Sequence, residues 1–134
     1  MVVEVTSLNQ QRLEVSARDV MLVVDRYATG GEPSAGFRAT ELLLGALGAC
    51  MVGTALEFAG RQGMPVTGIT MQLEEETIRH PTRVGEVAVT MTVRGQVTDE
   101  DLDRLRRVAA RCKVHNTLAS DSGPTIALTA VRSD

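Results

Sequence analysis

Two cysteines, Cys50 and Cys112, are the side chains of this 134-residue sequence whose chemistry stands out. Cys50 lies in a long apolar segment, whereas Cys112 lies between Arg111 and Lys113. Neighbouring cations lower the pKa of a thiol, and apolar surroundings raise it. Taken alone, each cysteine fits either a reactive thiol or a small buried side chain. Whether each cysteine is a reactive thiol or a packing residue therefore depends on the segment in which it lies.

Other site chemistries find little support in the sequence. Cys112 and His115 have a spacing that suits a metal ion, but a structural zinc needs four ligands and no second ligand pair is visible. Gly30-Gly31 is too short for a phosphate-binding loop, and the nucleophile motif G-x-S-x-G of serine hydrolases is missing. We therefore expect neither a metal nor a cofactor.

Composition narrows the class of protein. Two Phe, one Tyr and no Trp leave no aromatic platform for bases, and the net charge of −3 disfavours contacts with phosphates, so we expect no nucleic-acid partner. The N-terminus lacks the layout of a signal peptide. The longest uncharged run, residues 42–56, is shorter than the roughly 18 residues of a membrane span. These features predict a cytoplasmic protein with reduced thiols, no membrane segment and a single domain over residues 1–134.

Hydrophobic patterning predicts the elements that position the cysteines. The expected strands cover residues 2–6, 13–16, 21–24, 69–74, 87–93 and 125–131, with a turn at 80–83. The expected helical segments cover residues 40–61, 98–112 and 114–119, so that Cys112 ends a helix. Strands and helices do not alternate as they do in a parallel sheet, and the predicted fold class is therefore α+β.

The helix expected at residues 40–61 is apolar on every side, which is typical of a helix that is buried all round. Gly45, Ala49 and Gly53 recur every four residues and form a smooth stripe. Glycine inside a helix costs about 1 kcal/mol relative to alanine, so the stripe indicates close contact with another backbone. Packing on a sheet of the same chain is one explanation. We favour burial in the core of an oligomer, because so short a chain has few elements to surround a helix.

Three segments of the chain are distinctive as a set and in their order: residues 40–50 (TELLLGALGAC), 61–65 (RQGMP) and 111–118 (RCKVHNTL). They resemble the OsmC/Ohr family of peroxide-reducing proteins, and the resemblance runs from about the third strand to the end of the chain. It implies antiparallel sheets wrapped around long central helices in an intertwined homodimer. It also implies a thiol-dependent peroxidase that reduces organic hydroperoxides to alcohols during stress.

The resemblance assigns a role to each thiol. Cys50 would be the peroxidatic cysteine and Cys112 the resolving one, joined in a reversible disulfide. A dithiol reductant, either a small dithiol or a lipoylated protein, would restore both thiols. The chain departs from the family pattern at Lys113, where family members usually have proline.

The family activates its cysteine with an arginine that is held by a glutamate. The family's glutamate aligns with Thr40, so we assign this role to the adjacent Glu41. On a continuous helix Glu41 would lie about 13 Å along the axis from Cys50 and half a turn round, so it reaches the thiol only if the chain before Leu42 is not helical. For the arginine we assign Arg12, in the first hairpin, with Arg38 as the alternative.

Two other functions use the same residues. A dimer of this fold could bind an apolar ligand without catalysis, with Cys50 as part of the pocket wall. Alternatively, the two thiols could sense redox state without turnover. Peroxide consumption that depends on Cys50 separates the enzyme from both alternatives.

Overall fold

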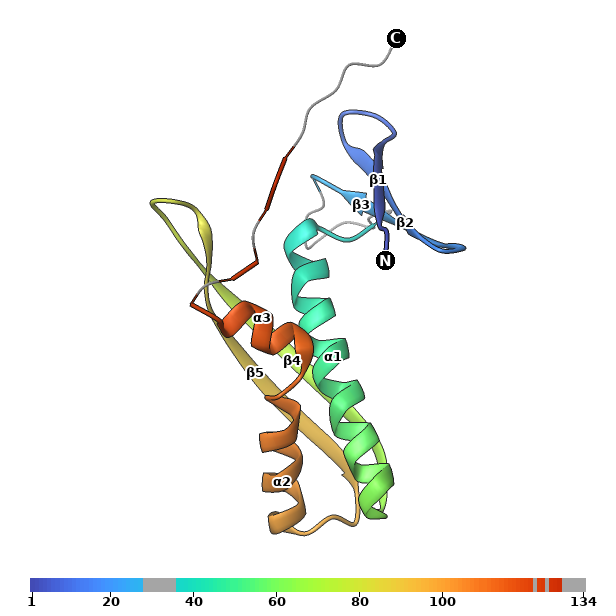
Figure 1. Cartoon of the computed structure of the whole chain (residues 1–134), viewed down its shortest axis with the longest axis vertical. Coiled ribbons are helices and arrows are strands. Elements are labelled where there is room, and N and C mark those ends of the chain that lie inside the picture. Colours follow the sequence, from blue (N-terminus) through green and yellow to red (C-terminus); the bar gives the residue numbers. More distant parts are fainter. Residues whose placement is uncertain (28–35, 122, 125, 129–134) are drawn as a thin grey trace. The chain divides into compact units, whose positions relative to one another are not determined.

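The structure is a computed structural model that describes residues 1–27, 36–121, 123–124 and 126–128. Its described elements follow one another as β1 (Glu4–Ser7), β2 (Arg12–Ala17), β3 (Val20–Asp25), α1 (Ala39–Gln62), β4 (Val66–Ile78), β5 (Arg83–Gly95), α2 (Asp99–Ala109) and α3 (Lys113–Ala119) (Figure 1). These elements confirm the predicted α+β class. The strand expected at 125–131 is not formed at residues 126–128, and its other residues lie outside the described part.

The chain groups into two compact units. The first comprises Met1–Ala46 and Glu74–Val87, and it contains an antiparallel sheet in the order β1-β2-β3. Val5 is paired with Val15 and Leu13 with Val24, so β-branched and leucine side chains meet across the strands. The predicted N-terminal hairpin and third strand are confirmed.

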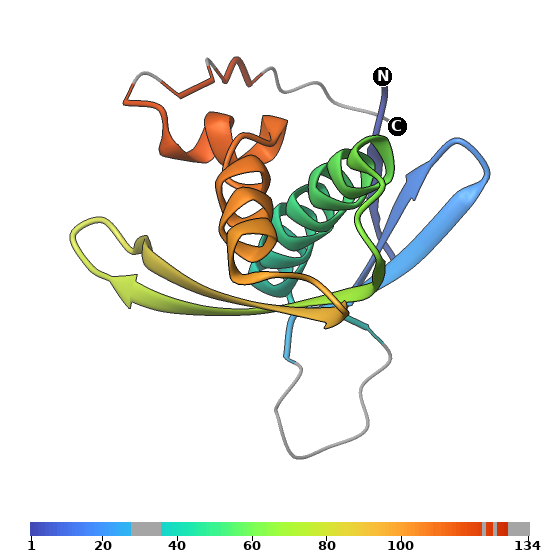
Figure 2. The same ribbon diagram turned by 90° about the horizontal axis from the view of Figure 1, so that it is seen from below.

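The second unit comprises Leu47–Leu73 and Ala88–Asp134, and it contains both cysteines. Here α1 packs on β4: a methyl group added at Gly48 would lie 2.8 Å from Leu73 Cδ1. In this unit α2 lies beside the C-terminal half of α1, and both helices lie over the same face of the β4–β5 hairpin (Figures 1 and 2). Leu105 and Ala109 of α2 are almost fully buried, as is Cys112 just beyond it. The second cysteine therefore belongs to the core of this unit.

The helix α1 starts and stops close to its predicted ends. Beyond Gln62 the chain turns at Gly63, whose φ of 63° favours glycine, and the Met64 N–H donates to the Ala59 carbonyl. Within α1, the acidic Glu41 lies in the first turn and the basic Arg61 in the last, where the helix dipole favours each charge. Local sequence signals are thus sufficient to predict both ends of α1.

Burial of α1 differs from the expectation of a helix buried all round. Leu47, Met51, Ala55 and Ala59 are buried at a spacing of four residues, so one stripe faces the rest of the chain. On another side Gly45, Ala49 and Gly53 are exposed. A methyl group added at either glycine would meet no atom within 4 Å. Within the described residues of one chain, the small-residue stripe of α1 is therefore left uncovered.

Among the described residues, α1 is the one helix long and apolar enough to cross a membrane by length and composition. It has 24 residues with a mean hydropathy of 1.8 over its most apolar window. A core helix of a folded domain meets the same criterion, so this finding alone is weak support for a membrane span.

The connection between α2 and α3 corrects the predicted helix 98–112. Thr98 begins α2 as its N-cap, and its side chain accepts a hydrogen bond from the Asp101 N–H, as expected of the capping motif Thr-Asp-Glu-Asp at residues 98–101. The helix then ends at Ala109, because Ala110 leaves helical geometry and the Arg111 N–H bonds back to the Val108 carbonyl. Cys112 is therefore the N-cap of α3 rather than the last residue of α2.

Candidate active site

The two cysteines lie together in the second unit, 62 residues apart in sequence. Cys50 lies on α1 and is partly exposed, whereas only 2% of Cys112 is exposed. Both are free thiols, and the Cys112 thiol donates a hydrogen bond to Cys50 Sγ. The two sulfurs therefore lie close enough to interact directly.

Backbone donors at the start of α3 lower the pKa of Cys50. The largest contribution is a hydrogen bond from the Val114 N–H to Cys50 Sγ, which outweighs the opposing effect of burial. The Cys112 thiol, the Lys113 N–H and the positive charge of Lys113 lower this pKa further. Each of these groups stabilises the thiolate more than the thiol. Cys50 is consequently the more acidic of the two thiols.

The surroundings of Cys112 have the opposite effect. Burial raises the pKa of the Cys112 thiol, and interaction with Cys50 raises it further. The His115 N–H donates to Cys112 Sγ at 3.3 Å and opposes this shift without reversing it. Cys112 therefore holds its proton more tightly than Cys50 does. The two thiols are chemically distinct, as an attacking and a resolving sulfur must be.

Sequence reasoning missed the backbone donors of Lys113 and Val114. Cys112 was expected at the C-terminal end of a helix, where carbonyl oxygens rather than N–H groups are free. In the structure it precedes α3, so that unpaired N–H groups of the first helical turn point toward Cys50. One signal was present: lysine stands at position 113 where the family has proline, and lysine carries the N–H that proline lacks.

Arg12 and Glu41 belong to the first unit, so their proximity to Cys50 remains a prediction. Arg12 is the exposed first residue of β2, with Asp25 as its partner in the register. Glu41 lies within α1, which is helical from Ala39, and its carboxylate accepts a hydrogen bond from the Arg38 N–H at 2.7 Å. Glu41 thus caps the helix in this chain. The non-helical start that would carry it toward Cys50 is not observed.

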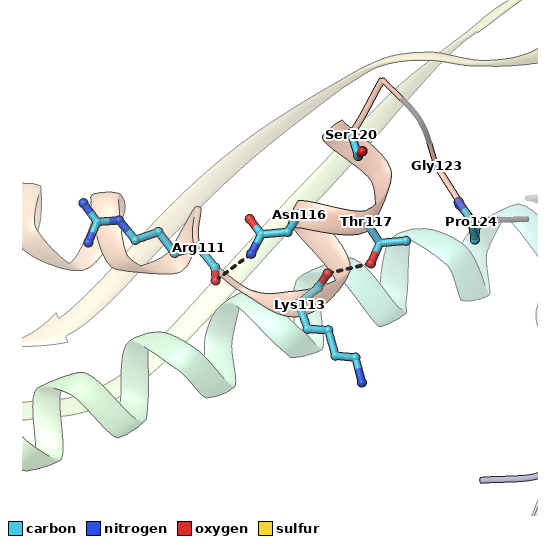
Figure 3. A pocket seen from close by; sticks show the side chains of 7 residues that line it. All are labelled: Arg111, Lys113, Asn116, Thr117, Ser120, Gly123 and Pro124. Atoms are coloured by element: carbon cyan, nitrogen blue, oxygen red, sulfur yellow. Dashed lines mark hydrogen bonds between the residues drawn. The ribbon is translucent and has the colours of Figure 1, made fainter.

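A cavity of about 600 Å³ borders the segment that carries Cys112 (Figure 3). Its lining is largely polar and consists of Arg111, Lys113, Asn116, Thr117, Ser120, Gly123 and Pro124. Two of the polar side chains bind backbone carbonyls: Asn116 Nδ2 donates to Arg111 O at 3.3 Å, and Thr117 Oγ1 donates to Lys113 O at 2.8 Å. In Figure 3 the Lys113 side chain points away from Asn116 and Thr117.

His115 is the third residue of α3 and contacts Cys112. Its backbone N–H, rather than its ring, bonds to the thiol of Cys112. The ring atom Nδ1 is buried without a hydrogen-bond partner among the described residues. In the described part of the chain no group of three or more His, Cys, Asp or Glu side chains could hold a metal ion.

An α+β fold with antiparallel sheets, a long central helix and a pair of distinct thiols defines a class of redox protein. Residues 30–128 match the family model of OsmC-like proteins, and the chain belongs to this family. The resemblance seen in the sequence is thereby confirmed. No curated protein matches the chain.

Solved structures share the fold at low sequence identity. An osmotic stress induced and detoxification response protein from Psychrobacter arcticus is 21% identical, with a TM-score of 0.77 and 90% of each chain covered. An OsmC-like protein from Mycoplasma pneumoniae is 19% identical, with a TM-score of 0.76 and coverage of 91% of this chain and 90% of that one. The organic hydroperoxide resistance protein OsmC from Legionella pneumophila is 16% identical, with a TM-score of 0.68 and coverage of 90% and 89%. The apolar α1 is the long central helix of this fold.

Proposed function

We propose that the protein is a thiol-dependent peroxidase that reduces organic hydroperoxides through a reversible Cys50–Cys112 disulfide. The observation that carries the proposal is the hydrogen-bonded pair of thiols whose pKa values shift in opposite directions. A merely structural cysteine needs no donors on its sulfur, whereas a nucleophilic thiolate does. Membership of the OsmC-like family supports a redox role for this pair.

The reaction follows from the two sulfurs. The Cys50 thiolate attacks one oxygen of the hydroperoxide, the O–O bond breaks, and the alkoxide takes up a proton to leave as an alcohol. Cys50 is then a sulfenic acid. The sulfur of Cys112 attacks it, forming the disulfide and releasing water. A dithiol reductant opens this disulfide by two thiol exchanges and is itself oxidised.

The substrate class and the reductant are part of the proposal. The Legionella relative is named an organic hydroperoxide resistance protein, which supports an organic peroxide as substrate. As reductant we propose a small dithiol or a lipoylated protein. Arg12 remains a proposed partner of Cys50, and its contribution would add to that of the α3 donors. Glu41 would join it only if the first turn of α1, which is helical from Ala39, were to unwind. The proposed compartment is the cytoplasm, where the thiols start reduced.

We also propose that the chain forms a homodimer through the exposed stripe of α1. Gly45, Ala49 and Gly53 leave open space on the helix surface, and Leu56 is 45% exposed one turn further on. An apolar stripe of this kind on the longest helix favours contact with a second copy of the chain. The small side chains allow two such helices to approach closely.

A peroxidase assay tests the proposed activity. Cumene hydroperoxide and a small dithiol are added to the parent protein and to the variants Cys50→Ser and Cys112→Ser. We expect turnover in the parent and none in Cys50→Ser. Serine at position 112 keeps an N-cap for α3, so this variant should fold and then stop after one oxidation. Equal rates in the parent and Cys50→Ser would refute the peroxidase.

Peptide mapping under non-reducing conditions tests the disulfide separately. One equivalent of organic hydroperoxide should join Cys50 to Cys112 within one chain. Formation of this disulfide without multiple turnover would instead identify a redox sensor. A Cys50 that stays a free thiol while peroxide is not consumed would leave it a packing role in a binding protein.

A further inference from the structure

Three arginines line a second cavity in the same unit, and neither cysteine contributes to its lining. This arginine cavity has a volume of about 200 Å³ and is lined by Phe58, Arg104, Arg107, Val108 and Arg111. The arginines are spaced three and four residues apart along α2 and just beyond it, which places them on one side of the helix. Phe58 comes from α1, so the cavity lies where the two helices meet.

Two of the three guanidinium groups are already paired with carboxylates. Arg104 Nη1 lies 3.5 Å from Asp101 Oδ1, and Arg107 Nε lies 3.2 Å from Asp103 Oδ2. Asp103 is shared, because Arg106 Nη2 also contacts it at 2.8 Å. Arg106 and then Arg107 hold the pKa of Asp103 below its usual value, so this carboxylate stays charged.

Arg111 has no such partner. In the part of the chain that the structure describes, its guanidinium makes no ion pair and no hydrogen bond to another side chain, and only its backbone groups are bonded. No carboxylate lines the cavity. The walls of the cavity therefore carry an excess of positive charge, although the whole chain has a net charge of −3.

The cavity is also partly organised in advance. The Arg104 guanidinium lies 5.2 Å from the centre of the Phe58 ring, and Arg104 Nη2 donates to Gln62 Oε1 at 3.1 Å. Stacking and hydrogen bonding hold the plane of this guanidinium, which reduces the entropy lost when a ligand binds. The N–H groups of Arg104 that these contacts leave free are thus held in a fixed orientation, while the unpaired Arg111 supplies the uncompensated charge.

We propose that the arginine cavity is a binding site for a small oxyanion, the carboxylate or phosphate group of a small molecule. Guanidinium groups offer paired N–H donors that match both kinds of anion. The volume greatly exceeds the share of one water molecule, about 30 Å³. This site goes beyond the proposed peroxidase, because no step at Cys50 or Cys112 depends on it.

Binding of inorganic phosphate and of acetate to the reduced full-length protein tests the proposal. Each anion is titrated by calorimetry and by NMR at constant ionic strength, with chloride as the reference anion. We expect saturable binding of at least one of them, with shifts at the Arg104 and Arg111 side chains. Which anion binds more tightly distinguishes a phosphate ligand from a carboxylate ligand.

Matched variants separate the site from general charge effects. Arg111→Gln should weaken binding about tenfold, the loss of one charge-assisted hydrogen bond. Phe58→Leu keeps every charge but removes the stack on Arg104, and it should also weaken binding. Arg79→Gln changes an exposed arginine next to the β4–β5 turn and should leave binding unchanged. Equal effects of Arg111→Gln and Arg79→Gln, or no saturable binding of either anion, would overturn the proposal. A failed peroxidase assay would not affect it.

Discussion

Replacement of Lys113 by proline gives the sharpest test of how α3 activates Cys50. Position 113 is the first residue of α3, where proline is well tolerated because its missing N–H is not needed within the helix. Cys112, the preceding residue, has φ −74° and ψ 158°, which is the extended conformation that a following proline requires. The substitution should therefore leave the fold intact while it removes one hydrogen-bond donor and one positive charge from Cys50.

Lys113→Gln provides the matched control, since it removes the charge and keeps the N–H. The difference between the two variants isolates a single hydrogen bond to the thiolate. Such a bond contributes about 1.4 kcal/mol, which corresponds to a roughly tenfold change in the thiolate population. A more basic thiolate is also a better nucleophile, and this recovers about a factor of three. We therefore expect Lys113→Pro to react about threefold more slowly than Lys113→Gln below the midpoint of titration.

The assay follows the reaction of Cys50 with a chromogenic disulfide as a function of pH. All variants carry Cys112→Ser, so that only one thiol reacts and α3 keeps its N-cap. Because the surrounding donors lower the pKa of Cys50, the rate should fall as pH drops through that pKa. Removing a donor raises the pKa, so the midpoint should move to higher pH in the order Lys113, Lys113→Gln, Lys113→Pro.

Salt separates the two contributions. Added salt should reduce the difference between the parent and Lys113→Gln, because it screens the charge of an exposed lysine. It should leave the difference between Lys113→Gln and Lys113→Pro unchanged. Identical pH profiles for these two variants would refute the view that the Lys113 N–H stabilises the thiolate, and circular dichroism would verify that α3 is still formed.

Three further predictions concern assembly and stability. Gly53→Leu fills the exposed stripe of α1 and should convert the proposed dimer to monomer or aggregate; light scattering after size exclusion checks this, and an unchanged dimer would place the interface elsewhere. Leu105→Ala removes a fully buried side chain and should lower the free energy of unfolding by about 2–5 kcal/mol in urea denaturation, whereas a loss below about 1 kcal/mol would contradict its place in the core. Thr98→Ala removes the N-cap of α2 and should cost about 1 kcal/mol; Thr98→Ser should restore most of it, and an unaffected Thr98→Ala would show that the Asp101 N–H needs no cap.

Local patterns in the sequence were sufficient for most elements of this protein. Short β-branched stretches predicted the first hairpin, and alternating apolar and polar residues predicted the second. The glycines after residue 59 predicted the end of α1, because helix termination depends on neighbouring residues. The capping motif at Thr98 located the start of α2 for the same reason. The two segments that contain the cysteines also identified the family, and the family-model match over residues 30–128 confirms it.

Only the tertiary structure decided how the two thiols differ. The sequence placed Cys112 at the end of a helix, but a turn of two residues after Ala109 makes it the beginning of the next one. That change exchanges carbonyl oxygens for N–H groups beside Cys50, which lies 62 residues away in the chain. No local pattern reports on such a contact, because the pKa of a thiol depends on groups that only folding brings within hydrogen-bond distance.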